Sequence, residues 1–333
     1  MNPTTKTEIM YESLDKAAGL LQKELGILYL EALSLAGNLM IHQNEPVNGL
    51  SEDAAKQLEQ IVKEVRPPFS YDKEEGRRAL QLAVLKGMKE ATQPHHAMTP
   101  DAVTVFAGFL VSQLLQKESD HKSKILDPAA GAGNLLTGVM NQQSTPVYAI
   151  GVEADETLAN LLFINSGIQG LDLAGIHDDS VKMDTFDEQV DLVVSDLPVG
   201  YYPDEQVIDE FRTKAQGTPT YVHHLLIEKS IEQVKEGGFL LFLIPNAFFQ
   251  SEQADILQAY LKDSAVIYAL LQLPETMFKA KEQQKSFLLL RKKQKGMAVP
   301  QQALLAEMPS FSRKEALQDM TRQISDWLSD HLS

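Results

Sequence analysis

The chain has 333 residues, of which 44% are hydrophobic, so it is long enough for one large domain and a smaller one. Cysteine is absent, which excludes disulfides and thiolate metal sites and is typical of a cytoplasmic protein. We expect neither a secretion signal nor a membrane span, because no apolar run reaches about 18 residues. The formal net charge of −16 at pH 7 argues against a broad DNA-binding face, which is normally basic.

Residues 1–92 have the periodicity of helices and no strand pattern. Apolar positions repeat with helical spacing over 7–25 and 27–41. Ser51 is a good N-cap for a third helix, and a capping-box pattern at Asp72 predicts a fourth helix that ends near residue 90. We expect an N-terminal all-helical domain that carries no chemistry and serves an accessory or pairing role.

Residues 93–101 form a joint between this domain and the rest of the chain. Thr99 is a good N-cap and Pro100 suits the first turn of a helix. A helix is therefore predicted over 101–116. The neighbouring His95 and His96 raise the question of a metal site. Adjacent side chains in an extended segment point in opposite directions, so we expect no metal ion there.

From residue 124 onward, strand and helix patterns alternate. Continuous apolar strands indicate a parallel sheet that is covered on both faces. The sequence therefore predicts an α/β fold with a doubly wound, mostly parallel sheet of seven strands, the last two as a hairpin-like pair. This domain is expected over 93–300, followed by a helical tail over 301–333. The predicted strands are 124–127, 147–153, 173–176, 190–196, 239–245, 266–273 and 286–291, and the predicted helices are 134–141, 156–166, 221–234 and 251–262.

A glycine-rich turn follows the first of these strands. Gly131 and Gly133 have no Cβ, so they can adopt positive φ and let a ligand lie against the backbone. Asp127 adds a carboxyl group at the carboxyl end of the strand, where open α/β sheets bind ligands. No Lys-Ser or Lys-Thr follows the glycines, and Leu136 replaces the third glycine of the dinucleotide fingerprint. The turn therefore indicates a nucleotide-like ligand without phosphate-loop chemistry.

Acidic residues end the next strands as well. Glu153 closes the second strand, where a carboxylate can accept hydrogen bonds from both hydroxyls of an adenosine ribose. Asp179 lies in an acidic loop after the third strand and is predicted to accept a hydrogen bond from an adenine amino group. Asp196 and Pro198 follow the fourth strand and suit a substrate amine. An aromatic amine is a poor nucleophile, and acceptors that bind its hydrogens free its lone pair for in-line attack on a sulfonium methyl.

These motifs, in this order, resemble those of adenine-specific DNA methyltransferases. Residues 127–136 are similar to the Asp-Pro-Ala-Cys-Gly-x-Gly cofactor motif, especially that of the modification subunits of type I restriction systems and their stand-alone relatives. Residues 98–100 resemble the Tyr/Phe-Thr-Pro motif that helps to hold the methionine part of the cofactor. Residues 237–246 are similar to the Gly-Gly-strand-Pro-Asn stretch of that family, and two segments follow its closing motif: 273–278 and 284–288.

The resemblance implies a class I, Rossmann-like methyltransferase fold and S-adenosylmethionine as cofactor. Its catalytic motif, Asn/Asp/Ser-Pro-Pro-Tyr/Phe, corresponds here to Asp196-Leu197-Pro198-Val199, so the first proline and the aromatic ring that stacks on a flipped base are replaced. Either Tyr201 or Tyr202 could supply that ring. The implied catalytic residues are Asp196, Pro198, Tyr201 and Tyr202. The implied cofactor-binding residues are Thr99, Asp127, Pro128, Ala129, Gly131, Gly133, Asn134, Leu135, Glu153, Ala154, Asp179 and Asp196.

Three functions remain open from the sequence. The resemblance implies methyl transfer to the exocyclic amino group of adenine in DNA. The acidic charge and the lack of a recognition domain favour amino methylation of a protein, an RNA or a small molecule instead. The two replaced motif positions favour a regulatory protein that binds the cofactor without catalysis. DNA is the partner that the resemblance implies, and the helical domain is a candidate surface for a homodimer or a partner subunit.

Overall fold

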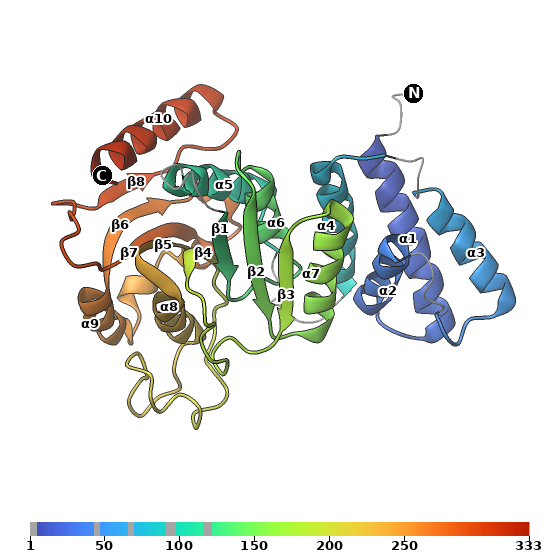
Figure 1. Cartoon of the computed structure of the whole chain (residues 1–333), viewed down its shortest axis with the longest axis horizontal. Helices are drawn as coiled ribbons and strands as arrows, with labels where there is room; N and C mark the ends of the chain where they lie inside the picture. The colour runs from blue at the N-terminus through green and yellow to red at the C-terminus, as the bar shows by residue number, and fades with distance from the viewer. Residues whose placement is uncertain (1–4, 43–46, 66–69, 91–97, 116–121, 333) are drawn as a thin grey trace.

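The computed structural model describes residues 5–42, 47–65, 70–90, 98–115 and 122–332. Helices and strands alternate through the second half of the chain, as the sequence predicts (Figure 1). The helices of the described residues are α1 (Lys6–Leu25), α2 (Tyr29–Ile41), α3 (Glu52–Lys63), α4 (Lys73–Glu90), α5 (Asp101–Leu115), α6 (Asn134–Asn141), α7 (Glu156–Gln169), α8 (Val222–Gln233), α9 (Ala254–Ser264) and α10 (Lys314–His331), with short 3-10 turns η1 (Phe248–Gln250), η2 (Glu275–Met277) and η3 (Lys281–Gln283). The strands are β1 (Ser123–Asp127), β2 (Val147–Glu153), β3 (Leu173–His177), β4 (Val190–Asp196), β5 (Val234–Pro245), β6 (Ala265–Gln272), β7 (Lys285–Lys292) and β8 (Leu304–Glu307).

All these strands form one sheet in the order β3-β2-β1-β4-β5-β7-β6-β8. The pairs from β3 to β5 are parallel, β7 runs antiparallel to both β5 and β6, and β8 is parallel to β6. The strand order reverses between β1 and β4, because β2 and β3 lie on one side and β5 on the other. Ligands bind at such a switch point, beyond the carboxyl ends of the strands.

Alternate residues of the central strands enter cores on opposite faces of the sheet. Ile125 and Leu192 pack with apolar residues of α5, α6 and α10. Leu126 and Val193 pack with α8 and α9 on the other face. Figure 1 shows these helices covering the two faces. Both faces are buried, which confirms the predicted doubly wound α/β fold.

The helices α1–α4 form a separate layer beside the β3 edge of the sheet (Figure 1). Their apolar residues share one core with α7, to which α7 contributes Leu158, Leu161, Ile164 and Ile168. The N-terminal all-helical domain predicted from the sequence is therefore present and is packed directly on α7 of the sheet domain.

The prediction of seven strands is wrong by one. The additional strand, β8, is only four residues long and lies in the segment that the sequence assigned to a helical tail over 301–333. Its burial alternates between half-buried and exposed positions because it is an edge strand. In α10, Ile324 and Leu328 are buried in the core under β6 and β7, so this tail belongs to the sheet domain. In the described part of the chain, no helix has the length and apolarity needed to cross a membrane.

Candidate functional site

Two aspartates stand at the switch point of the sheet. Asp127 is the last residue of β1 and Asp196 is the last residue of β4, and these strands are neighbours. The glycine turn follows Asp127, and Glu153 ends β2 on the other side of β1. The fold therefore brings together the carboxyl groups that the sequence singled out at three strand ends.

Gly131 and Gly133 have the predicted positive φ, at 55° and 81°, but for different reasons. No atom lies within 4 Å of the position that a Cβ on Gly131 would take, so this glycine faces open space. A Cβ on Gly133 would lie 2.5 Å from Cδ1 of Leu162. Gly133 therefore permits close packing against α7, and Gly131 leaves room for a ligand.

Asp127 is almost fully buried, with 1% of its surface exposed. Its Oδ1 accepts a hydrogen bond from the backbone N–H of Ala129 at 3.1 Å. Burial raises the pKa of Asp127 to about 7. The nearby Ser195 hydroxyl and the hydrogen bond from Ala129 oppose this shift, and the charges of Glu153 and Asp196 add to it. This carboxyl group therefore titrates close to neutral pH.

The Glu153 carboxylate anchors the glycine turn. One oxygen accepts from the N–H of Gly131 at 2.8 Å, and the other accepts from the N–H of Asp155 at 2.9 Å. The exposed Ala154 lies between these acidic residues, and its carbonyl is 3.2 Å from Nε2 of His177. Glu153 is thus fixed beside Gly131, with lone pairs left for a ligand hydroxyl.

The side chain of Asp179 is held in place by two hydrogen bonds, one of them from Tyr202. The Tyr202 hydroxyl donates to Oδ2 of Asp179 at 2.6 Å, and Oδ1 accepts from the N–H of Val181 at 2.9 Å. Burial, followed by the contact with Asp179, raises the pKa of Tyr202. Tyr202 is 5% exposed, so in this structure it positions Asp179 and does not face a substrate ring.

Asp196 joins three separate parts of the chain. Its Oδ2 accepts a hydrogen bond from the hydroxyl of Thr99 at 2.9 Å, and its Oδ1 is paired with the ammonium group of Lys285. Lys285 begins β7 and lies opposite Pro245 in the register of β5. The helix α5 begins at Asp101, as predicted, but the Thr99 hydroxyl that was expected to cap it binds Asp196.

Asn134 connects the glycine turn to Thr99. Its Nδ2 donates to the carbonyl of Thr99 at 2.8 Å, and its Oδ1 accepts from Nη1 of Arg77 in α4. The side chain of Leu135, by contrast, is buried in the core with α5. Pro128 and Ala129 form the start of the turn, and the carbonyl of Pro128 accepts from the Ser180 hydroxyl at 2.6 Å.

An aromatic row lies beside Pro198. Tyr201 stacks on Tyr221 with ring centroids 4.8 Å apart, and Tyr221 stacks on His223 at 5.0 Å. Burial lowers the pKa of His223 to about 4, against a hydrogen bond to the Pro198 backbone that raises it, so this imidazole is neutral at pH 7. Tyr201 is 52% exposed. Of the two tyrosines considered, Tyr201 is the one that presents a ring to solvent.

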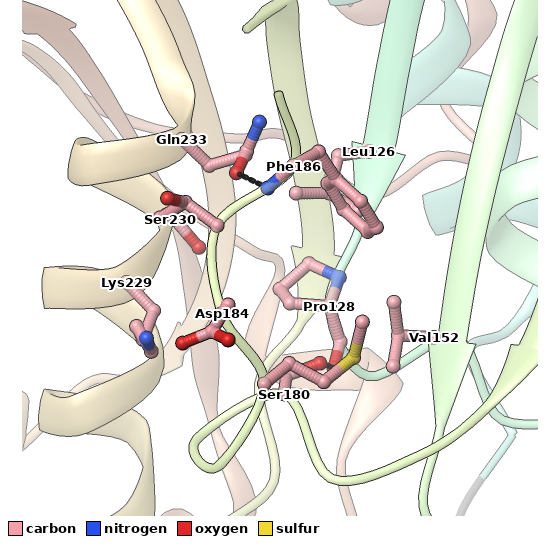
Figure 2. Close-up of a pocket in the computed structure, with 11 residues that line it drawn as sticks. Leu126, Pro128, Val152, Ser180, Asp184, Phe186, Lys229, Ser230 and Gln233 are labelled. Atoms are coloured by element: carbon pink, nitrogen blue, oxygen red, sulfur yellow. Dashed lines mark hydrogen bonds between the residues drawn. The ribbon is translucent and has the colours of Figure 1, made fainter. Parts of the chain in front are cut away.

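A cavity lies on the α8 face of the sheet, behind the glycine turn (Figure 2). Ser180 and residues 183–186 line one wall and α8 lines the other, where the side chain of Gln233 accepts a hydrogen bond from the N–H of Phe186 at 2.7 Å. Among the residues predicted to bind the cofactor, it includes Pro128 alone. This cavity is therefore distinct from the group of carboxylates at the strand ends.

The described residues offer no candidate metal site. They include no group of three or more histidine and acidic side chains that could hold a metal ion, and His95 and His96 lie outside them. In the basic run 291–295, Arg291 donates to the carbonyl of Gly237, Lys292 to that of Val234 and Lys293 to that of Lys262. These contacts attach the run to β5 and to the end of α9.

Several residues of this site were not predicted from the sequence, among them Arg77, Lys285, Tyr221 and His223. Lys285 was within a quoted motif, and the position of β7 beside β5 could have placed it at the same sheet edge as Asp196. Arg77 gave no signal, because it lies in the domain that was expected to be accessory and is 57 residues from Asn134.

Comparisons with known proteins agree with the fold and its two parts. Residues 8–88 match the family described as YtxK N-terminal helical domain, and residues 89–327 match the family described as N-6 DNA Methylase. The protein YtxK of Bacillus subtilis (strain 168) is 38% identical over 320 residues, which are 96% of each chain. The structure of a candidate class I S-adenosylmethionine-dependent methyltransferase of Listeria monocytogenes is 33% identical, with a TM-score of 0.88 over 97% of this chain and 99% of that one. A type I restriction-modification methyltransferase subunit of Streptococcus thermophilus shares the fold at 14% identity, with a TM-score of 0.63 over 96% of this chain and 74% of that one.

Proposed function

Because the chain belongs to the N-6 DNA methylase family, we propose that it transfers a methyl group from S-adenosylmethionine to an amino group, and that this amino group is the exocyclic amine of adenine in DNA. One contact carries the proposal. The Thr99 hydroxyl of the cofactor motif is bonded directly to the Asp196 carboxylate of the acceptor motif, at 2.9 Å. This hydrogen bond therefore joins the cofactor motif directly to the acceptor motif.

S-adenosylmethionine, the cofactor that this family and fold imply, is an adenosine with a positively charged sulfonium. The residues present fit it on two observations. Gly131 faces open space where a Cβ would stand, which allows close approach of a ligand to the backbone. The carboxyl groups of Asp127, Glu153 and Asp196 lie close enough for the last two to raise the pKa of the first, and this surplus of negative charge favours a cation.

The residues of the chain have separate roles in the proposed reaction. Glu153 binds the ribose hydroxyls, and Asp179, held by Tyr202, binds the adenine amino group of the cofactor. When bound, the cofactor supplies an electrophilic methyl group. Asp196 and the Pro198 carbonyl accept the hydrogens of the substrate amine, which frees its lone pair and orients it for attack.

Tyr201 is proposed as the ring that stacks on the flipped base, in place of the aromatic residue that Val199 replaces. Tyr201 is half exposed, and its ring stacks on Tyr221, which stacks in turn on His223. Base stacking on an aromatic ring contributes about 1–3 kcal/mol. The support from Tyr221 reduces the entropy that Tyr201 would lose on binding.

A second candidate substrate is an amine outside DNA, in a protein, an RNA or a small molecule. The net charge of −16 and the structural use of the basic run 291–295 favour it, because they leave little positive charge to attract phosphates. A third candidate is cofactor binding without catalysis, which the loss of the stacking ring at Val199 favours.

One experiment separates these candidates. The purified chain is incubated with radiolabelled S-adenosylmethionine and unmethylated DNA, RNA, protein and metabolite fractions, and cofactor binding is measured by calorimetry. We expect label in adenine of DNA, lost in Asp196→Ala and kept in Asp187→Ala, which changes an exposed loop acid.

Label in another fraction alone would support the second candidate. Binding without any transfer would support the third, and absence of cofactor binding would refute the proposal as a whole.

The helical domain is proposed as the surface for a second copy or a partner subunit. It exposes apolar side chains, including Leu28 at 71% and Leu82 at 44%, and exposed apolar surface often marks interaction sites. Sedimentation analysis of the full chain tests for self-association.

A further inference from the structure

The helical domain contributes a buried cation to the edge of the candidate site. Arg77 of α4 is 1% exposed although its neighbour Arg78 is exposed. Its guanidinium donates to both oxygens of Glu74, at 2.6 and 2.8 Å, and to Asp101 of α5 at 3.0 Å. Its remaining arm, Nη1, donates to Oδ1 of Asn134. One arginine thus connects α4, α5 and the first residue of α6.

From Asn134 the hydrogen bonds continue to the acceptor carboxylate. Asn134 uses its amide oxygen for Arg77 and its amide nitrogen for the carbonyl of Thr99, at 2.8 Å. Thr99 then donates its hydroxyl to Asp196 at 2.9 Å. The row is buried at Arg77, Asn134 and Thr99, so water does not compete for these bonds and each group fixes the orientation of the next.

We propose that Arg77 is a positioning residue of the methyl-transfer site, acting through Asn134 and Thr99 on Asp196. The inference rests on the proposed function and deepens it, because it makes the helical domain a part of the site. The planar guanidinium suits this role, since its rigid fork presents several donors in fixed directions. Without it, the buried Oδ1 of Asn134 loses its donor, and the amide is free to turn away from Thr99.

Arg77 could instead serve only to attach the helical domain, and the test must separate the two roles. The variant Arg77→Met keeps much of the side-chain volume and removes every donor. Arg78→Met is the matched control, since it makes the same change one residue later on the exposed side of α4. The midpoint of thermal unfolding is measured with and without S-adenosylmethionine, and the dissociation constant is measured by calorimetry.

If Arg77 only attaches the helical domain, Arg77→Met lowers the unfolding midpoint equally with and without S-adenosylmethionine. The increase in midpoint that the cofactor causes is then unchanged. A positioning role makes that increase smaller and weakens binding about tenfold, as expected when a buried partner is left unsatisfied. In an Asn134→Leu background, Arg77→Met is expected to cause no further loss of affinity, because the intermediate group is already gone. If Arg77→Met does not fold, Arg77→Lys, which keeps the charge without the fork, is measured in the same way.

Unchanged affinity in the Arg77 variant, or an equal loss in Arg78→Met, would overturn the inference while the proposed function stands. If the unmodified chain itself does not bind S-adenosylmethionine, the proposed function fails, and the positioning role fails with it.

Discussion

The buried carboxyl group of Asp127 makes the stability of the chain depend on pH in an unusual direction. Burial raises its pKa from 3.8 to about 7, so between these values the folded chain binds a proton that the unfolded chain has released. Stability therefore falls as pH rises through this window. At 1.36 kcal/mol per pKa unit, the full effect is about 4 kcal/mol, and the part lost between pH 5 and pH 8 is about 3 kcal/mol.

The variant Asp127→Asn removes this titration and keeps the shape of the side chain. Without cofactor, we expect it to be more stable than the unmodified chain by about 1–2 kcal/mol at pH 5 and by about 4 kcal/mol at pH 8, because the unmodified chain loses stability as the pH rises from 3.8 to about 7. Urea unfolding at the two pH values measures the difference, with Asp187→Asn as the control at an exposed loop position. Equal pH dependence in the unmodified chain and Asp127→Asn would refute the reasoning.

The affinity for S-adenosylmethionine should change with pH in the direction opposite to stability. A cation beside Asp127 lowers the pKa of this carboxyl group, so binding releases a proton and the affinity increases as pH rises through about 7. Calorimetry in two buffers of different ionisation enthalpy counts the proton. The asparagine variant is expected to bind more weakly at pH 8 and to release none. If Asp127→Asn is more stable than the unmodified chain but binds S-adenosylmethionine more weakly, the charge of Asp127 destabilises the fold and strengthens cofactor binding.

Two further predictions concern the cofactor side of the site. Gly131→Ala is expected to weaken S-adenosylmethionine binding and to reduce stability by only about 1 kcal/mol. Gly133→Ala is expected to reduce stability by about 2 kcal/mol or more, because its Cβ would clash with Leu162. Calorimetry and urea unfolding of both variants check this, and equal losses of stability would contradict it. Tyr202→Phe removes the 2.6 Å bond to Asp179 and is expected to reduce stability by about 1 kcal/mol and to weaken cofactor binding; unchanged calorimetric affinity would show that Asp179 needs no such support.

Local patterns were sufficient to predict the elements that carry the cofactor motifs. β2, β4 and α6 have the predicted bounds, because continuous apolar strands and a glycine turn are determined within a few residues of sequence. The edge strand β8 was missed for the opposite reason. It is short and half exposed, so its pairing with β6, and not its own residues, makes it a strand.

Side-chain partners that are distant in sequence could not be predicted in this way. The positive φ of Gly133 was predicted, but not its packing against Leu162, which depends on where α7 lies. The ion pair between Lys285 and Asp196 joins positions 89 residues apart and follows from the antiparallel insertion of β7 beside β5. Arg77 reaches Asn134 only because the helical domain packs on α7. Such contacts are set by tertiary topology, which no local pattern records.

The altered acceptor motif is explained in part by the backbone. In the family motif, a proline stands where this chain has Leu197, and its ring restricts the chain next to the acceptor carboxylate. Leu197 lacks that ring, but it is 1% exposed and its N–H donates to the carbonyl of Leu243 on β5 at 3.3 Å. Proline has no N–H and could not make this bond. Burial and a backbone hydrogen bond therefore hold Asp196 where the family uses a ring, so the change at Leu197 does not argue against catalysis. The other change, at Val199, removes the stacking ring, and Tyr201, half exposed and stacked on Tyr221, is the ring proposed to take its place.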